Sequence, residues 1–339
     1  MSPILLPFNR GRAATEAHVR EVLRPLADAI RRERERFNFS PGARGWCYVL
    51  EGLGLCSKGD FAKVQERITR CRKLGLLPLN ICAVDDTRES QGGGAWAYDL
   101  TPAEFLARAI NGLRTRYRAC NTLDVYRFNV EVLVEKLDLV GLFQRVLYEF
   151  GVPVICTRGS NDMHSRAGIL QRAASTALPT VVLAFGDHDP GGLSIISHTR
   201  DNLAECVVAA EVDASVIDRV SVVRAGLLRK DVEALGLTWI DGLETSAGGD
   251  LASPSHPQHR NADVQAYLAE FGPRKCEANA LIARPTEAAE VLRRELLKYI
   301  SASEVAEVRR RNGEANKIVA GLVVRAVEFV ESLEEGDAP

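Results

Sequence analysis

The chain has 339 residues, of which 46% are apolar, and its formal net charge is −2. This length predicts two or three domains, and the apolar fraction suffices for ordinary hydrophobic cores. No apolar run approaches the roughly eighteen residues of a membrane span, and the N-terminus lacks the basic-then-apolar pattern of a secretory signal. Eight cysteines without a Cys-x-x-Cys pair indicate reduced, mostly buried thiols and no structural zinc. We therefore expect a cytoplasmic protein with no membrane span.

The N-terminal part of the chain is basic. Residues 10–75 hold fifteen Lys and Arg against eight Asp and Glu, a net charge of +7 that leaves −9 for the rest. Residues 60–74 have apolar side chains at helical spacing, which predicts a helix with one buried face that ends at Gly75. The apolar stretch 76–84 predicts a hairpin or wing. Two short helices and a wing are typical of a winged helix-turn-helix, which offers one helix to a DNA groove.

A second face of the 60–74 helix carries the residues that we expect to contact DNA. These residues are Lys63, Arg67 and Arg70. Because the N-terminal part is basic while the remainder is acidic, we interpret this face as a contact to the phosphates of double-stranded DNA. The alternative interpretation is an ordinary solvated helix face.

The next segments connect this basic part to a predicted sheet. Residues 89–95, with three glycines at 92–94, predict a linker, and a helix is expected over residues 102–118. Apolar runs at 128–134, 152–156 and 178–184 then predict buried strands, each followed by a helix. This alternation favours a parallel sheet flanked by helices.

Carboxylates follow two of these strands. Glu135 comes directly after the first, and Asp187 and Asp189 come in the sequence Phe-Gly-Asp-His-Asp-Pro-Gly-Gly after the third. Side chains alternate along a strand, so the two aspartates point the same way and His188 points away. Carboxylates about 4 Å apart repel by roughly 4 kcal/mol at an intermediate dielectric constant, and a hard divalent cation removes this cost. The three acids therefore predict a Mg²⁺ (or Mn²⁺) site at the carboxyl edge of the sheet.

Each of these acids also has a simpler interpretation. Paired aspartates at a strand end serve in other proteins as helix caps or salt-bridge partners, and Glu135 has a lysine beside it.

The C-terminal third contains fewer signals of function. Residues 220–223 predict another strand, and residues 240–262, rich in Gly, Ser, Pro and His, predict a long loop that is either ordered on binding or mobile. Two amphipathic helices are expected at about 286–300 and 303–334.

The strand-end acids resemble those of a Toprim domain. The order Val134-Glu135-Lys136, then Arg158-Gly159-Ser160, then the glycine-flanked aspartates is similar in particular to the topoisomerase VI A subunit and its relatives. The family includes the meiotic double-strand-break transesterase and short stand-alone bacterial or viral winged-helix–Toprim homologues, sometimes called mini-A. The resemblance covers about residues 35–205, with a weaker echo at residues 276–281.

The resemblance also implies a nucleophile. In the family, an Arg precedes a Tyr-Tyr pair and the second Tyr attacks DNA; here Arg44 and Tyr48 match the Arg and the attacking Tyr, while Cys47 replaces the first Tyr. A free tyrosine has a pKa near 10, so its ionisation at pH 7 costs roughly 4 kcal/mol. Arg44, one helical turn before Tyr48, is the cation expected to lower this cost or to assist proton transfer. Without the resemblance, Tyr48 is most simply a core or rim residue.

The function that the resemblance implies is that of a type IIB DNA topoisomerase A subunit, an isomerase that cleaves and rejoins DNA through a 5′-phosphotyrosine. The family places the Tyr of one protomer against the acids of the other, which implies a homodimer with two composite sites. The chain has no Gly-x-x-x-x-Gly-Lys-Ser/Thr loop, so strand passage would need a separate ATPase subunit. A DNA-bound protein of this kind would be associated with the nucleoid.

These observations predict an α/β chain with a CAP-like winged helix-turn-helix followed by a Toprim domain. The expected boundaries are 1–90 for the winged helix with Tyr48, 91–124 for the linker and connecting helix, 125–230 for the metal-binding core, and 231–339 for a C-terminal extension.

Two other functions stay open. One is a Toprim metal nuclease that hydrolyses DNA and uses Tyr48 only for packing, and the other is a non-catalytic protein that binds or bridges DNA. The sequence leaves several properties open: whether the chain cleaves DNA alone, its preferred DNA topology or sequence, its pathway, and the role of Glu277, which is either a fourth acid of the site or an ordinary strand-end charge.

Overall fold

The structure is a computed structural model, and it describes residues 4–6, 15–83, 100–113, 117, 120–157, 163–245 and 249–336. The chain forms two compact units, one of residues 1–85 and 129–296 and the other of residues 86–128 and 297–339. This division differs from the four consecutive segments expected from the sequence, because the connecting helix and the last helix belong to the same unit. The predicted linker glycines at 92–94 lie outside the described residues.

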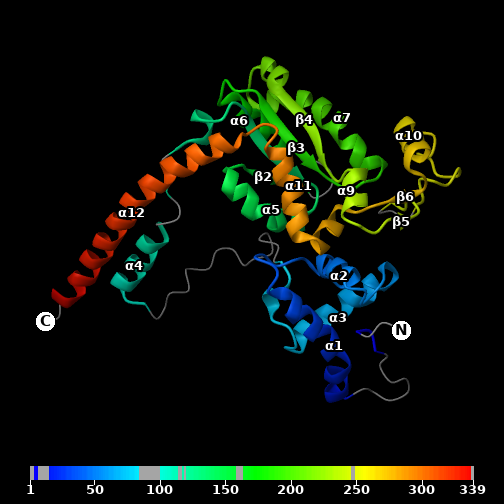
Figure 1. The fold of residues 1–339 in the computed structure, drawn as a ribbon, viewed down its shortest axis with the longest axis horizontal. Helices are drawn as coiled ribbons and strands as arrows, with labels where there is room; N and C mark the ends of the chain where they lie inside the picture. The colour runs from blue at the N-terminus through cyan, green and yellow to red at the C-terminus, as the bar shows by residue number, and fades with distance from the viewer. Residues whose placement is uncertain are drawn as a thin grey trace. The chain divides into compact units, whose positions relative to one another are not determined.

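The first unit is built on a parallel sheet of four strands in the order β2-β1-β3-β4 (Figure 1). The strands are β1 (Asn129–Val134), β2 (Val154–Cys156), β3 (Thr180–Phe185) and β4 (Val220–Gly226). All three pairings are parallel, and β1 and β3 lie side by side over their full lengths. Every residue of β1 and β3 is buried, which agrees with the apolar runs that predicted them. The predicted parallel sheet is confirmed, and the carboxyl ends of its two central strands meet at one edge.

Helices cover both faces of this sheet. One face packs against α6 (Met163–Ala174), α7 (Pro190–Glu205) and α8 (Val207–Ala210), which share a core with Val182 and Ala184 of β3. The other face packs against α5 (Leu137–Phe150) and α11 (Pro285–Leu296), where the rings of Phe143 and Phe185 meet edge to face at 4.9 Å. The α/β architecture predicted for this part of the chain is therefore confirmed.

The segment after β4 crosses back to the carboxyl edge of the sheet. It contains α9 (Arg229–Ala234), a two-stranded antiparallel ribbon of β5 (Ile240–Asp241) and β6 (Arg274–Lys275), and α10 (Ala262–Phe271) between those strands. A 3₁₀ helix, Ala278–Ala283, follows β6. The described residues of the predicted 240–262 loop form mainly turns, but the segment begins with β5, which pairs with β6.

Three helices form the N-terminal part of the first unit. They are α1 (Glu16–Arg34), α2 (Ala43–Gly52) and α3 (Phe61–Lys73). The apolar side chains that predicted the buried face of α3 are buried, and they are those of Phe61, Val64, Ile68 and Cys71. The helix ends before Gly75, which has a φ of 69°. Over residues 74–83 the chain forms a 3₁₀ helix (Leu79–Ile81) and no strand, so the expected hairpin at 76–84 is wrong for its described part.

The apolar residues of that segment have another use. Leu77, Ile81 and Cys82 are buried, and the indole nitrogen of Trp46 donates a hydrogen bond of 2.7 Å to the carbonyl of Ile81. The segment therefore seals the helical core below α2 and does not pair with itself.

Arg67 does not share the exposed basic face predicted for α3. Lys63 and Arg70 are exposed, whereas Arg67 is 3% exposed and donates a hydrogen bond of 2.6 Å to the carbonyl of Leu6. The prediction is wrong for Arg67 because it follows Val64 by three residues and therefore lies on the buried face of the helix.

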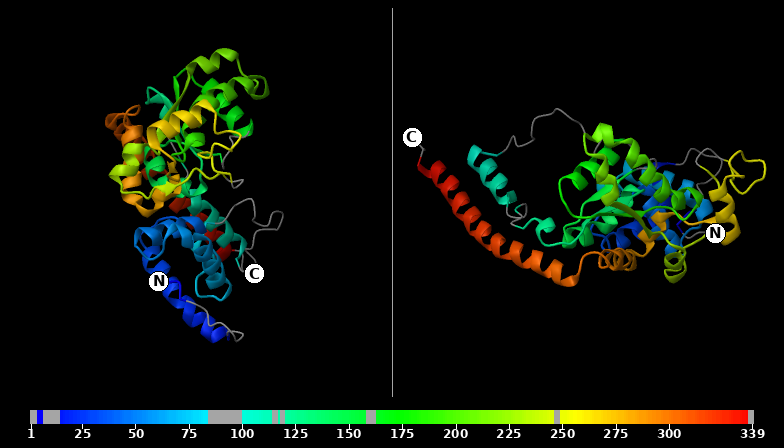
Figure 2. Two further views of the ribbon diagram at one scale, coloured as in Figure 1. Left: turned by 90° about the vertical axis from the view of Figure 1, so that its right-hand side faces the viewer. Right: turned by 90° about the horizontal axis from the view of Figure 1, so that it is seen from above.

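The second unit contains α4 (Pro102–Gly112) packed against α12 (Ala302–Gly336), and Figures 1 and 2 show the two helices side by side. Arg127 and Glu304 form an ion pair at 3.4 Å, and the rings of Phe128 and Tyr299 meet at 5.7 Å. An apolar groove of about 520 Å³ runs between the helices. Among the described residues, no helix combines the length and apolar character needed to cross a membrane.

Candidate functional site

A cleft of about 720 Å³ lies at the carboxyl edge of the sheet. The three predicted acids line it together with Arg44 of α2, and the ribbon of β5 and β6 lies along its other side. Phe61, the first residue of α3, and Lys58 of the preceding 3₁₀ helix (Lys58–Asp60) also line it. Six acidic and four basic side chains face this space, so the cleft carries a net negative charge. The structure thus brings together residues from the two parts of the chain that the sequence singled out.

The turn after β3 presents the two aspartates. Asp189 is the N-cap of α7, and its Oδ1 accepts a hydrogen bond of 2.6 Å from the N–H of Gly192, while Pro190 begins the helix. A Cβ on Gly192 would lie 2.0 Å from the carbonyl oxygen of Asp187, so only glycine fits there. Arg224 of β4 holds the turn from below, because it donates to the carbonyl of Asp187 at 2.7 Å.

His188 points away from the cleft, as the alternation of side chains predicted. It is 1% exposed, and its Nδ1 lies 3.0 Å from the hydroxyl of Tyr267. Its backbone forms an antiparallel bridge with Cys276, with hydrogen bonds of 2.8 Å and 3.0 Å. This bridge fixes the position of the next residue, Glu277, beside the aspartate turn.

Lys136 lies between two of the acids. Its Nζ is 2.5 Å from Oε1 of Glu135 and 3.0 Å from Oδ2 of Asp187. Burial raises the pKa of Asp187, and the charge of Glu135 raises it further. Burial also raises the pKa of Asp189. The simpler interpretations are therefore realised in part, because Asp189 caps a helix and Glu135 pairs with a lysine.

This arrangement of acids suits a metal ion in its chemistry but not in its geometry. No group of three or more His, Cys, Asp or Glu among the described residues is assembled to hold a metal ion. Between Glu135 and Asp187 lies the ammonium of Lys136, which contacts both carboxylates. The chemistry of the donors does suit a hard cation, since all are carboxylate oxygens at the edge of a cleft with excess negative charge. A divalent cation would therefore have to displace the Lys136 ammonium.

Tyr48 lies on α2 with its side chain 1% exposed. Its hydroxyl donates a hydrogen bond of 2.6 Å to Oε2 of Glu277, and its ring meets that of Phe61 edge to face at 5.0 Å. The ammonium of Lys58 lies 4.8 Å from the centre of the Tyr48 ring. The ring is thus enclosed by protein, and the hydroxyl is held by a carboxylate from a segment 229 residues further along the chain.

Arg44 reaches the same carboxylate. Its guanidinium donates to both oxygens of Glu277, at 2.6 Å to Oε1 and at 2.8–2.9 Å to Oε2. Burial and the charge of Glu277 raise the pKa of Tyr48 far above its usual value, and Arg44 opposes this shift without reversing it. Arg44 thus acts on the pKa of Tyr48 in the expected direction, but burial and the charge of Glu277 outweigh its effect.

Cys47, at the position where the sequence resemblance expects the first Tyr, does not line the cleft. Cys47 is fully buried, with its sulfur 3.4 Å from the carbonyl of Ala43, and burial raises its pKa to about 12. This departure from the family pattern therefore alters the core of the helical part and not the lining of the cleft.

Glu277 is the residue whose role the sequence left undecided. The signal was the weak echo at 276–281, but no local pattern links this glutamate to an arginine and a tyrosine more than 220 residues away. Of the other sequence features, Arg158-Gly159-Ser160 lies outside the described residues.

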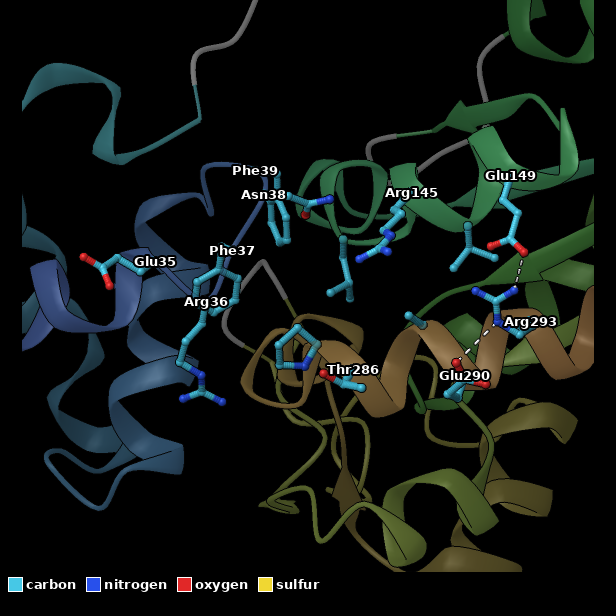
Figure 3. Close-up of a pocket in the computed structure, with 14 residues that line it drawn as sticks. Glu35, Arg36, Phe37, Asn38, Phe39, Arg145, Glu149, Thr286, Glu290 and Arg293 are labelled. Atoms are coloured by element: carbon cyan, nitrogen blue, oxygen red, sulfur yellow. Dashed lines mark hydrogen bonds and ion pairs between the residues drawn. The ribbon is translucent and has the colours of Figure 1, made fainter. Parts of the chain in front are cut away.

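A second cavity, of about 490 Å³, lies on another side of the first unit, between residues 35–39 and helices α5 and α11. Figure 3 shows Arg293 between Glu149 and Glu290, and it is 2.8 Å from the first and 3.3 Å from the second. None of the predicted site residues lines this cavity, so we assign it no function.

No family model, no curated protein and no solved structure matches this chain. The assignment of a function therefore depends on the cleft itself and on the resemblance of its sequence motifs.

Proposed function

We propose that this protein is a metal-dependent DNA transesterase of the topoisomerase VI A type, which cleaves and rejoins DNA through a phosphotyrosine at Tyr48. The observation that carries this proposal is the contact between the Tyr48 hydroxyl and Glu277 at the edge of an acid-lined cleft. A hydroxyl nucleophile beside a carboxylate and an arginine is the arrangement expected for covalent attack on a phosphate.

The neighbouring groups support the same chemistry. Glu135, Asp187 and Asp189 would hold Mg²⁺ or Mn²⁺ once Lys136 moves aside, and the bound cation would neutralise the charge of a phosphate in the cleft. Because the cleft is net negative without a cation, a DNA phosphate would enter it most readily together with the metal.

The path of the DNA is part of the proposal. Lys63 and Arg70 are exposed on α3, whose first residue, Phe61, lines the cleft together with Lys58 of the preceding 3₁₀ helix. A duplex bound along α3 in the manner of a winged helix would therefore lead to the cleft. The Toprim and winged-helix assignments, the homodimer and a separate ATPase subunit belong to this proposal, which the sequence resemblance supports.

One feature differs from the arrangement that the resemblance implies. Tyr48 contacts Glu277 of its own chain, whereas the family pairs the tyrosine with the acids of a second protomer. In a dimer of this protein, each cleft would then consist of residues from a single protomer, unless the two protomers exchange their N-terminal helices.

The test is covalent trapping. The protein is incubated with end-labelled duplex DNA and Mg²⁺ or Mn²⁺, quenched with detergent, and examined for label that migrates with protein. We expect trapping by the wild type, none by Tyr48→Phe, and wild-type trapping by Tyr148→Phe, whose ring is 67% exposed on α5. Label that stays free with wild-type protein, while DNA remains intact, would contradict the proposal.

A second candidate function is a metal-dependent nuclease that uses water in place of Tyr48. The observation that favours it is the burial of Tyr48, which is 1% exposed while the three acids line the cleft directly. In the same assay, a nuclease would give shortened free DNA with both the wild type and Tyr48→Phe, whereas a non-catalytic DNA-binding protein would shift the DNA without cutting it.

A further inference from the structure

Glu277 has a role that neither the sequence pattern nor the proposed metal site assigns. Both of its oxygens are engaged: Oε1 by Arg44, and Oε2 by Arg44 and by the hydroxyl of Tyr48. The backbone bridge between Cys276 and His188 fixes the residue next to the aspartate turn, yet the hydrogen bond to Oδ1 of Asp187 comes from the N–H of Ala278 and not from the Glu277 side chain. Glu277 therefore serves the tyrosine and not the three strand-end acids.

The geometry is that of a nucleophile, a base and a group that orients the base. The Tyr48 oxygen and Oε2 of Glu277 are 2.6 Å apart, which is within the range for direct proton transfer. Arg44 grips the carboxylate with two nitrogens, which fixes its plane and keeps it ionised. The hydroxyl proton of Tyr48 thus already points at a carboxylate.

Arg44 also determines how strong a base Glu277 is. Burial acts to raise the pKa of Glu277, but the hydrogen bonds from Arg44 and Tyr48 and the charge of Arg44 outweigh it, so the pKa lies below its usual value. The Arg44 side chain is 46% exposed and lines the cleft, where it can contact a phosphate. When a phosphate draws Arg44 away, only the hydrogen bond from Tyr48 and the charge of Lys58 still oppose the effect of burial, so the pKa of Glu277 rises and Glu277 becomes a stronger base.

We propose that Glu277 is the general base for Tyr48 and that Arg44 is the positioning residue which releases it when a DNA phosphate enters the cleft. The inference rests on the proposed function. In the cleavage step, the O–H bond of Tyr48 breaks and its proton passes to Oε2 of Glu277. The Tyr48 oxygen bonds to phosphorus, the bond from phosphorus to the 3′ oxygen breaks, and the 3′ oxygen takes a proton from water.

Rejoining uses the same groups in reverse. The 3′ hydroxyl attacks phosphorus and gives its proton to water, the bond between phosphorus and the Tyr48 oxygen breaks, and protonated Glu277 returns its proton to the departing phenolate. The number of covalent bonds is conserved, so no nucleotide cofactor is needed for the chemistry itself.

The test measures trapping rates for Glu277→Gln and Glu277→Asp. Glutamine keeps the size and the hydrogen-bond acceptor of Glu277 but cannot take the proton, so we expect trapping to fall by about 10²–10⁴-fold. Aspartate is expected to recover part of the rate. Glu287→Gln is the matched control, because Glu287 is an exposed glutamate on α11 that does not line the cleft, and we expect it to trap at the wild-type rate.

A sulfur leaving group distinguishes a base from a metal ligand. When sulfur replaces the 3′ bridging oxygen of DNA, the leaving group departs without protonation or metal coordination. Tyr48 must still lose its proton before it can attack. We expect Glu277→Gln to be equally defective on this DNA and to require the same Mg²⁺ concentration as the wild type. Rescue by sulfur, or a shifted Mg²⁺ requirement, would assign Glu277 to the metal and overturn the inference.

A measurement without DNA separates the inference from the proposed function. With tyrosine ¹³C-labelled at Cζ, the seven tyrosines give signals of which Tyr48→Phe identifies one. We expect that signal to move in Glu277→Gln and to stay in Glu287→Gln. A signal unaffected by Glu277→Gln would overturn the inference whatever the DNA assay shows. Wild-type protein that traps no DNA overturns the proposed function and the base with it, whereas equal trapping by wild type and Glu277→Gln overturns only the base.

Discussion

The cleft has two halves that differ in how their charges are balanced. The tyrosine half consists of Arg44 and Glu277, which line the cleft, and of the buried Tyr48, so that a single carboxylate accepts hydrogen bonds from an arginine and a phenol. The strand-end half consists of Glu135, Asp187 and Asp189, where the ammonium of Lys136 contacts the first two and the charge of Lys275 acts on the third.

This difference shows which half is complete by itself. In the tyrosine half every oxygen of the carboxylate has a donor, so the arrangement is preformed before any substrate arrives. In the strand-end half, burial and mutual repulsion raise the pKa of Asp187, which marks a place where added positive charge is stabilising. We infer that the tyrosine half is complete before DNA binds, whereas the strand-end half is completed only by a bound cation.

The largest expected effect is a loss of folding stability caused by a steric clash in the turn that carries Asp187 and Asp189. Gly192→Ala puts a Cβ 2.0 Å from the carbonyl oxygen of Asp187, so the turn has to open and we expect a loss of about 3 kcal/mol, the upper end for overpacking. Chemical denaturation measures it. Gly191→Ala is the control, because its Cβ would be 3.5 Å from Asp189, an ordinary contact. If the two variants are equally stable, the close contact at Gly192 does not constrain the turn.

Removal of one acid tests the cation directly. We expect Asp187→Asn to weaken Mg²⁺ or Mn²⁺ binding on the order of 100-fold, a loss of the size seen when a metal site is disrupted. Calorimetric titration of the protein without DNA measures it. Asp241→Asn is the control, because Asp241 lines the same cleft but is exposed on β5. If both variants bind the ion as the wild type does, the strand-end half is not a metal site.

Lys136 sharpens the comparison because it acts as a built-in cation. Lys136→Met leaves Glu135 and Asp187 without their partner, so in a chelator we expect a loss on the order of 2 kcal/mol in the free energy of unfolding. Added Mg²⁺ should then stabilise the variant more than the wild type, since the ion no longer competes with the ammonium. Thermal melts with and without Mg²⁺ measure both effects. Identical stabilisation of the two proteins by Mg²⁺ would place the ion elsewhere.

The smallest expected effect concerns the route of DNA to both halves. Lys63→Ala and Arg70→Ala should each weaken duplex binding by roughly fivefold on every sequence, with a salt slope shallower by about 1. Titrations at several salt concentrations measure it, and Lys230→Ala, an exposed lysine on α9, serves as control. Affinity that responds to Lys230 as strongly as to α3 would show that binding follows overall charge and not this helix.

The two halves also differ in how far the sequence predicted them. Glu135 and Asp187 follow strands with strong apolar patterns, and parallel pairing of β1 with β3 necessarily brings their ends together. The sheet and the strand-end half were therefore accessible from local patterns. Lys136 was predicted only as an alternative partner of Glu135, because a sequence does not show whether a metal ion or an ammonium group balances a carboxylate.

The tyrosine half was predicted only in part. Arg44 and Tyr48 lie one turn apart on α2, and this spacing was readable, but the partner of both came from a segment with no distinctive pattern. The errors have local causes too. Arg67 lies on the buried face because three-residue spacing from Val64 outweighed its charge, and the expected wing failed because its apolar residues fill the helical core.

The hydrogen bond between Tyr48 and Glu277 spans 229 residues of chain, and this separation has a consequence for synthesis. The ribosome completes the basic helices first, while the carboxylate that grips Tyr48 is still unmade. A nascent chain can therefore acquire the helices proposed to hold DNA long before its cleft exists. The order of translation keeps the proposed nucleophile without its base until the last fifth of the protein has begun to emerge.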